Sequence, residues 1–136
     1  MRTEQKHKLA QLRHWRVRRK IRGTRERPRM SVRFTNKNIY VQFTDDNTGT
    51  TLASASTVSR NVPDRDRLAA NVAGARIIGK LAAEAALARG IKSVVFDRGP
   101  ARYHWSKVKG KDGKPATVLG KLATLAGAAR EAGLKF

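Results

Sequence analysis

Positive charge is concentrated in the first quarter of this chain, in a segment with little apolar surface from which a core could form. Residues 1–37 hold fourteen Lys or Arg and two acidic residues, a net charge of +12 out of +20 for the whole chain. The apolar side chains of the first twenty residues make only a thin helical stripe of Leu9, Leu12, Trp15 and Val17. Such a segment buries too little to fold alone, so we predict an arm that orders fully on a partner.

The net charge indicates which partners to expect. A free globular protein gains nothing from such self-repulsion, so we expect a polyanion, with nucleic acid first and an anionic membrane second. The membrane is the weaker alternative, because no apolar run approaches the roughly 18–20 residues of a spanning helix and no secretory signal opens the chain. A length of 136 residues fits a single domain.

The chain has no cysteine, which excludes disulfides, thiol nucleophiles and thiolate metal sites and fits a reducing cytoplasm. Its three histidines, His7, His14 and His104, are too scattered to suggest a metal site, although His7 and His14 could share a helix face. We interpret them as solvated or phosphate-contacting residues. We therefore expect no metal and no other cofactor.

After the arm, apolar and polar residues alternate in the pattern that is typical of β-strands. Residues 30–35, 38–44 and 50–56 alternate apolar with polar positions and are rich in β-branched and aromatic side chains. Turn sequences separate them, so we predict an antiparallel meander of three strands. Its buried face should carry Val32, Phe34, Ile39, Val41 and Phe43, and its other face Arg33, Thr35, Tyr40, Gln42 and Thr44.

A helix should follow the meander, capped by Asp64 or Asp66 and ending near Arg89. Its many alanines, together with Gly74 and Gly79, suggest close packing on a sheet.

Residues 91–96 indicate a buried strand, and residues 117–132 a second helix. The predicted fold class is therefore α/β: three antiparallel strands, helix, strand, helix. This domain would span residues 30–136, behind a basic arm and loop at residues 1–29.

A second basic segment lies between the last predicted strand and the last helix. Residues 101–116 contain Arg102, the aromatic run Tyr103-His104-Trp105, and four lysines at 107, 109, 111 and 114. Because Gly110, Gly113 and Pro115 interrupt it, we predict an irregular Lys-rich loop.

Phosphate binding is the chemistry that the basic arm favours most. Arg offers a planar charged fork that matches phosphate oxygens, and Lys offers a mobile point charge. A charge run is usually a solvated face, but this run is almost unbalanced by acids. The aromatic side chains Trp15, Tyr40, Tyr103 and Trp105 lie among cations and favour RNA over DNA, because unpaired RNA bases stack on such rings. The alternative for Tyr40 and Trp105 is that they cap the edge of the core.

The acidic residues do not suggest a catalytic site. A two-metal nuclease needs carboxylates that converge from strands and loops, whereas those of this chain lie mostly at predicted turns and caps. Only Asp97, at a strand end, looks like a site residue, and we favour pairing with Arg98 or capping of the next turn. No nucleophile–base pair and no glycine-rich phosphate loop is present. We therefore predict no enzymatic activity and no small-molecule substrate.

Four sequence blocks resemble one family. They are RRKIRGTRERPRMSVRFTNKNIYVQFTDD at residues 18–46, GTTLASAS at 49–56, GIKSVVFDRG at 90–99 and AAREAGLKF at 128–136. Together they are similar to the bacterial large-subunit ribosomal protein L-eighteen family, which binds 5S rRNA. The resemblance covers nearly the whole chain in the same order.

The resemblance implies a structural protein of the large ribosomal subunit, with a fold related to the ribonuclease-H-like topology. Its partners would be 5S rRNA, 23S rRNA and the neighbouring ribosomal protein L-five, in the central protuberance of a cytoplasmic or organellar ribosome. No membrane is expected. Ribonuclease-H-like enzymes carry a catalytic Asp on their first strand, but residues 30–35 contain no acid. The expected scaffold therefore lacks the metal site.

The resemblance and the basic pattern together give the candidate RNA-binding residues. In the arm and the loop after it they are Arg13, Arg16, Arg18, Arg19, Lys20, Arg22, Thr24, Arg27 and Arg29. In the first hairpin they are Arg33, Asn36, Lys37 and Tyr40. In the late segment they are Arg98, Arg102, Tyr103, His104 and Lys107.

This sequence departs from the family pattern in two places. Trp105 occupies a position where the family usually has Gly, and about fourteen residues around 106–119 look inserted. Two other functions stay open at this point, a general nucleic-acid-binding module of the nucleoid type and, less favoured, a metal-dependent nuclease.

Overall fold

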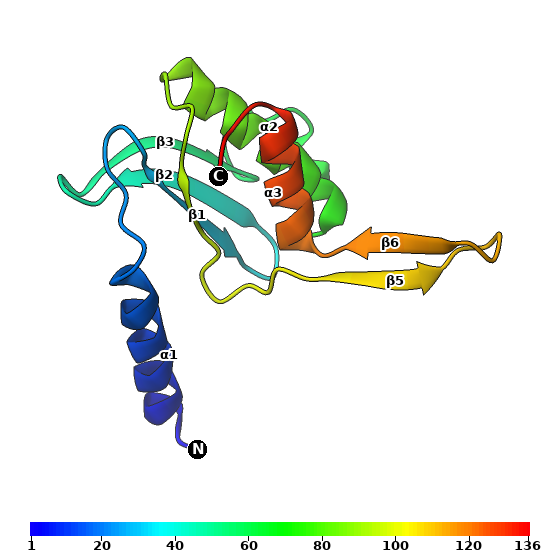
Figure 1. The fold of residues 1–136 in the computed structure, drawn as a ribbon, viewed down its shortest axis with the longest axis horizontal. Helices are drawn as coiled ribbons and strands as arrows, with labels where there is room; N and C mark the ends of the chain where they lie inside the picture. Colours follow the sequence, from blue (N-terminus) through cyan, green and yellow to red (C-terminus); the bar gives the residue numbers. More distant parts are fainter.

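A helical arm, a sheet with two helices, and a projecting hairpin make up the chain (Figure 1). The computed structural model describes all residues, 1–136. The elements in order are α1 (Thr3–Arg18), β1 (Arg29–Phe34), β2 (Ile39–Asp45), β3 (Thr50–Ser56), α2 (Val72–Ala88), β4 (Val95–Asp97), β5 (Trp105–Lys109), β6 (Pro115–Leu119) and α3 (Lys121–Glu131). None of the helices combines the length and apolarity needed to cross a membrane.

The predicted meander is confirmed, with strand bounds that differ from the prediction by no more than one residue. β1 pairs antiparallel with β2, placing Val32 opposite Val41, and β2 pairs antiparallel with β3. β4 then joins β1 in parallel, so the sheet order is β3-β2-β1-β4. The predicted strand at 91–96 is shorter and later, because only Val95–Asp97 pairs with β1. The relation to ribonuclease-H-like folds stays a prediction.

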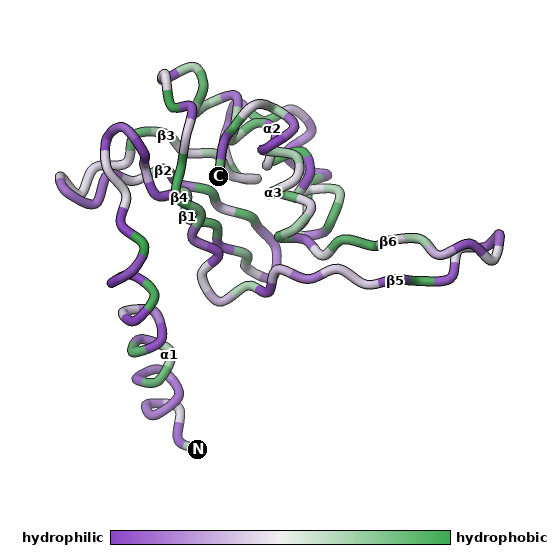
Figure 2. The backbone as a smooth tube through the Cα atoms, viewed as in Figure 1, coloured by the Kyte–Doolittle hydropathy of each residue, from purple (hydrophilic) through white to green (hydrophobic).

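One face of the sheet forms the core with α2 and α3. Ile39, Val41 and Phe43 of β2 are buried together with Ile78 of α2 and Leu125 of α3. Figure 2 shows these strands as a largely hydrophobic centre, while the hairpin tip is hydrophilic and the arm is mostly hydrophilic with short hydrophobic stretches. Both helices lie against the same buried face, so the opposite face of the meander is left without a helical cover.

The close packing predicted for Gly79 occurs between the two helices rather than on the sheet. A Cβ added at Gly79 would lie 2.5 Å from the carbonyl oxygen of Leu125. The glycine therefore lets the backbones of α2 and α3 approach each other directly. Gly74 is also tightly packed, but against the preceding chain, because an added Cβ would lie 2.1 Å from the Ala69 carbonyl oxygen. Its N–H donates at 2.7 Å to the side chain of Asn71, which caps the start of α2.

The predicted start of that helix was wrong. Asp64 and Asp66 belong to a short 3-10 turn around Arg65–Arg67, and α2 begins only after the cap at Asn71. The Asn71 side chain satisfies one of the first N–H groups of α2. Residues 57–71 therefore form a longer connection than the sequence indicated.

The predicted loop at 101–116 was also wrong, because most of it is a β-hairpin. β5 and β6 pair antiparallel, with Trp105 opposite Leu119 at one end and Lys109 opposite Pro115 at the other. Gly113, with a positive φ of 72°, helps to form the turn, in which the Gly110 N–H donates to the Lys114 carbonyl at 2.8 Å. Pro115 opens β6, where a strand tolerates proline. The chain thus has six strands rather than the predicted four, and α3 begins at Lys121 instead of residue 117.

Candidate nucleic-acid interface

The arm is a helix that buries nothing. All residues of α1 are exposed, including the thin apolar stripe of Leu9, Leu12, Trp15 and Val17. Figure 1 shows α1 extending away from the sheet, connected to it only at its C-terminal end. Most helical stability in proteins comes from packing of an amphipathic face, and α1 has no such support in the free chain. Its basic side chains are therefore exposed to a partner, and only Arg18 also contacts the domain.

A single carboxylate, that of Asp46, ties the root of the arm to the sheet. Its oxygens accept the Gly23 N–H at 2.8 Å and two Arg29 guanidinium N–H groups at 2.9 Å each. Arg18, the last residue of α1, donates to the same carboxylate at 3.4 Å. The bonds from Arg29, together with the Gly23 N–H and the neighbouring charges, lower the pKa of Asp46 from 3.8 to about 2.

Position 23 requires glycine because the junction has no room for a side chain. An added Cβ would lie 2.3 Å from the Arg29 backbone nitrogen and 2.5 Å from the Thr44 carbonyl oxygen. The Gly23 carbonyl also accepts the Asp46 N–H at 3.1 Å, so backbone and side chain both connect here. The chain between α1 and β1 is thereby held against the end of β2.

Arg29 differs from the other predicted RNA-binding residues because it is only 6% exposed. Its guanidinium group lies between Asp46 and Asp97, and donates to Asp97 at 3.1 Å. Hydrogen bonding to Asp46 is the main cause that raises the pKa of Arg29. Because the Arg29 guanidinium group is already paired with both carboxylates, we leave Arg29 out of the proposed interface.

The expected pairing of Asp97 with Arg98 was wrong, because Asp97 pairs with Arg29 instead. The turn-capping role is confirmed, since Asp97 accepts the Gly99 N–H at 3.0 Å. Arg98 points elsewhere and donates to the Ala101 carbonyl at 2.9 Å. Hydrogen bonds made by two of its own side chains therefore stabilise the loop after β4.

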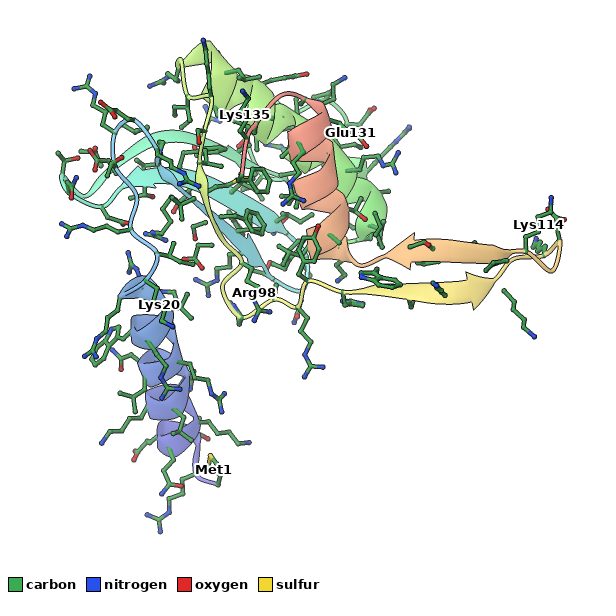
Figure 3. All side chains as sticks on the ribbon, in the orientation of Figure 1. Met1, Lys20, Arg98, Lys114, Glu131 and Lys135 are labelled. Atoms are coloured by element: carbon green, nitrogen blue, oxygen red, sulfur yellow. The ribbon has the colours of Figure 1, made fainter.

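A groove of about 530 Å³ separates α1 from this loop. Arg13, His14 and Val17 line it from the helix, and residues 97–100, including Arg98, line it from the other side. Figure 3 shows Arg98 in the loop beside the C-terminal part of α1. One cation of the arm, Arg13, and one cation of the loop, Arg98, thus line opposite walls of one concave surface although they are far apart in sequence.

The uncovered face of the meander continues the basic surface. Arg33 lies directly opposite Tyr40 in the β1–β2 pairing, as predicted for the face that carries both. Arg33 is exposed and Tyr40 half-buried. Asn36 and Lys37 are exposed in the turn between the two strands, which the Thr35 N–H closes by donating to the Asn38 carbonyl at 2.9 Å.

Several other candidates are exposed but have structural contacts. The Thr24 hydroxyl accepts the Arg27 N–H at 3.1 Å, and the Tyr103 hydroxyl accepts from Arg130 at 3.3 Å. The ring of His104 lies against Gly120, at the base of the hairpin. The Arg27 side chain is exposed as well and donates to the Val94 carbonyl at 3.4 Å. The remaining candidates are exposed at the surface: Arg16, Arg18, Arg19, Lys20, Arg22, Arg102 and Lys107.

The structure does not bring all candidates into one site. Arg13 and Arg98 line opposite walls of the groove, and Arg33 and Tyr40 are paired on the sheet, whereas Lys107 lies on the projecting hairpin. Sequence reasoning missed Asp46, which looked like an ordinary turn residue after a strand. The only signal was an acidic pair placed next to a segment of nearly unbalanced positive charge.

Comparison with known proteins gives the family. Residues 4–136 match the family model described as ribosomal L18 of archaea, bacteria, mitochondria and chloroplast. The chain is 49% identical over 131 residues to large ribosomal subunit protein uL18 of Lactococcus lactis subsp. cremoris, covering 96% of this chain and 95% of the relative. It is 47% identical to the uL18 protein of Lactobacillus acidophilus, with the same coverage.

A third relative is the uL18 protein of Pseudothermotoga lettingae, 45% identical over 91% of this chain and 89% of its own length. The matches include the basic arm as well as the α/β domain, since they extend over nearly the whole chain. The chain therefore belongs to the ribosomal L18 family, whose members are structural constituents of the large ribosomal subunit and not enzymes.

Proposed function

We propose that this protein binds 5S rRNA and helps to attach it to 23S rRNA in the central protuberance, beside ribosomal protein L-five, in the cytoplasm. The observation that carries the proposal is the groove between α1 and residues 97–100, where Arg13 and Arg98 face each other. Cations on both walls can neutralise phosphates of one RNA segment lying between them. The uncovered sheet face with Arg33 and Tyr40 would extend that contact surface.

The junction at Asp46 supports the same function. When a basic segment binds RNA, it loses less conformational entropy if one end of the segment is already held in place. Asp46 holds both the loop at Gly23 and the end of α1 at Arg18, so the root of the arm is fixed on the domain. Arg29 contributes to this arrangement from within the protein, while its exposed neighbours in the arm bind RNA.

The proposal can be tested with full-length protein in which the groove has lost its charge. Arg13→Gln combined with Arg98→Gln should weaken binding to 5S rRNA and flatten its salt dependence. Each lost phosphate contact lowers the slope of log affinity against log salt by about 0.7–0.9, so we expect a change of roughly 1.5. The matched control is Arg76→Gln with Lys80→Gln, two exposed cations of α2, which should leave the slope unchanged.

A competition experiment separates this proposal from a general nucleic-acid-binding module. Labelled 5S rRNA bound to the wild-type protein is displaced with either unlabelled 5S rRNA or a DNA duplex of similar length, at fixed salt. Displacement by 5S rRNA at much lower concentration supports the proposal. Equal displacement by both competitors would contradict it and favour the general module.

A further inference from the structure

Like α1, the β5–β6 hairpin has little support from the rest of the fold. Every residue of both strands is exposed, and the pair projects from the domain as a free ribbon (Figure 1). Five paired positions at about 3.4 Å each make a ribbon roughly 17 Å long. A two-stranded hairpin on its own is marginally stable in water, so a binding partner would be expected to stabilise this one.

The pairing gives the hairpin two different faces. Residues directly opposite each other in an antiparallel pair share a face, and successive residues alternate between faces. One face therefore carries Trp105, Lys107 and Lys109 of β5, together with the residues paired with them on β6. The other face is smaller and less polar, with Val108 and Val118. Trp105 is 58% exposed at the base of the ribbon.

The cations of the hairpin have no partners within the protein. Lys111 and Lys114 lie in the turn and add to Lys107 and Lys109, against one acid, Asp112. None of these four lysines is within ion-pairing distance of a carboxylate. Lysine is depleted in protein–protein interfaces, whereas phosphate backbones attract it. The charge therefore favours RNA over a protein as the molecule that covers this ribbon.

We infer that the β5–β6 hairpin is a second RNA-binding element, which contacts a different rRNA segment from the one in the groove beside α1. Figure 3 shows Lys114 at the hairpin tip and Met1 at the end of α1 in widely separated positions, and the two elements extend in different directions. The lysines would bind backbone phosphates, and Trp105 would stack on an unpaired base. The narrow major groove of an RNA helix excludes side-chain readout, so the contact is to backbone or to unpaired nucleotides. This inference rests on the proposed RNA-binding function.

Photo-crosslinking in assembled large subunits tests the inference. Three variants each carry one diazirine-bearing amino acid. It replaces Lys109 on the cationic face of the hairpin in the first, Gln11 in the groove in the second, and Lys80 on α2 in the third, which is the control. We expect RNA crosslinks from positions 109 and 11 that map to different rRNA segments. Crosslinks from position 109 to protein only, to nothing, or to the same segment as position 11 would overturn the inference. Protein-only crosslinks from position 11 would instead contradict the proposed function.

Salt dependence gives a second, quantitative test with full-length protein and a mixture of deproteinised 5S and 23S rRNA. Replacing the four hairpin lysines, Lys107, Lys109, Lys111 and Lys114, with Gln should lower the slope of log affinity against log salt by about 3. The matched control replaces four exposed cations elsewhere, Arg76, Lys80, Arg89 and Lys92. Since all eight side chains are exposed, circular dichroism should show folded protein in both variants. An unchanged slope for the hairpin variant would refute the inference.

Discussion

Asp46→Asn tests whether one carboxylate connects the arm to the domain. The substitution keeps the side-chain shape and an oxygen that can accept the Gly23 N–H, but it removes the charge that pairs with Arg29 and Arg18. Arg29 would keep only Asp97 as a charged partner, although its guanidinium is almost completely buried. The loss should therefore lower the stability of the folded state.

The pKa of Asp46 gives the magnitude. Its fall from 3.8 to about 2 corresponds to about 2 kcal/mol of folding free energy, since one pKa unit is about 1.4 kcal/mol. Breaking a fully buried ion pair costs about 3–5 kcal/mol, but the Asp46 side chain is 15% exposed, so the lower value applies. We expect Asp46→Asn to lose about 2 kcal/mol and roughly 8 °C in Tm.

The effect should depend on pH in a defined direction. A carboxyl whose pKa is lowered in the folded state stabilises the protein above its unfolded pKa, and this contribution disappears as the pH falls through the folded value. The difference between wild type and variant should therefore be full at neutral pH and about half as large near pH 3. Urea unfolding at several pH values measures it.

A suitable control for this experiment is Asp66→Asn, because that side chain is 96% exposed and makes only a long contact with Arg65. Exposed pairs of this kind contribute little, so its free energy of unfolding should change by less than about 0.5 kcal/mol. If Asp46→Asn unfolds with the wild-type free energy at neutral pH, or if the difference persists undiminished on acidification, the Asp46 carboxylate does not stabilise the junction through its charge.

Three further substitutions test the packing. Gly23→Ala should destabilise the protein by about 1–3 kcal/mol in urea unfolding, because the added Cβ would collide with the Arg29 backbone. Wild-type stability of this variant would show that the loop moves freely. Gly127→Ala, with open space around the added Cβ in α3, should instead stabilise by about 0.5–1 kcal/mol, and a loss of stability would contradict the helix assignment there. Phe43→Ala should cost about 3–5 kcal/mol, since Phe43 is fully buried at the centre of the sheet; a loss below about 1 kcal/mol would contradict that position.

The meander could be predicted from sequence because burial on one face specifies a strand strongly. Val32, Ile39 and Val41 alternate with polar residues, and shifting the register by one residue would expose all of them. The same alternation predicted that Arg33 and Tyr40 share a face. The exposure of the basic arm followed equally directly, because its sequence contains too few apolar side chains to bury.

The hairpin and the ion network could not be read in the same way. Gly110 and Pro115 were interpreted as breakers, but in the structure they flank a turn and open a strand, so the alternation around them was missed. Arg29 looked like one more cation of the arm. Its partners lie 17 and 68 residues away, at Asp46 and Asp97, and only the pairing of β1 with β2 and β4 brings them together.

The length of α1 has a consequence for how RNA first encounters the protein. Sixteen residues at about 1.5 Å each carry charge roughly 24 Å outward from the sheet. At physiological ionic strength electrostatic fields decay over about 8 Å, so the end of α1 lies some three screening lengths from the body. An approaching RNA therefore meets the field of the helix before that of the domain. α1 thus enlarges the target presented to RNA, and the association rate depends on how far its cations extend as well as on how many there are.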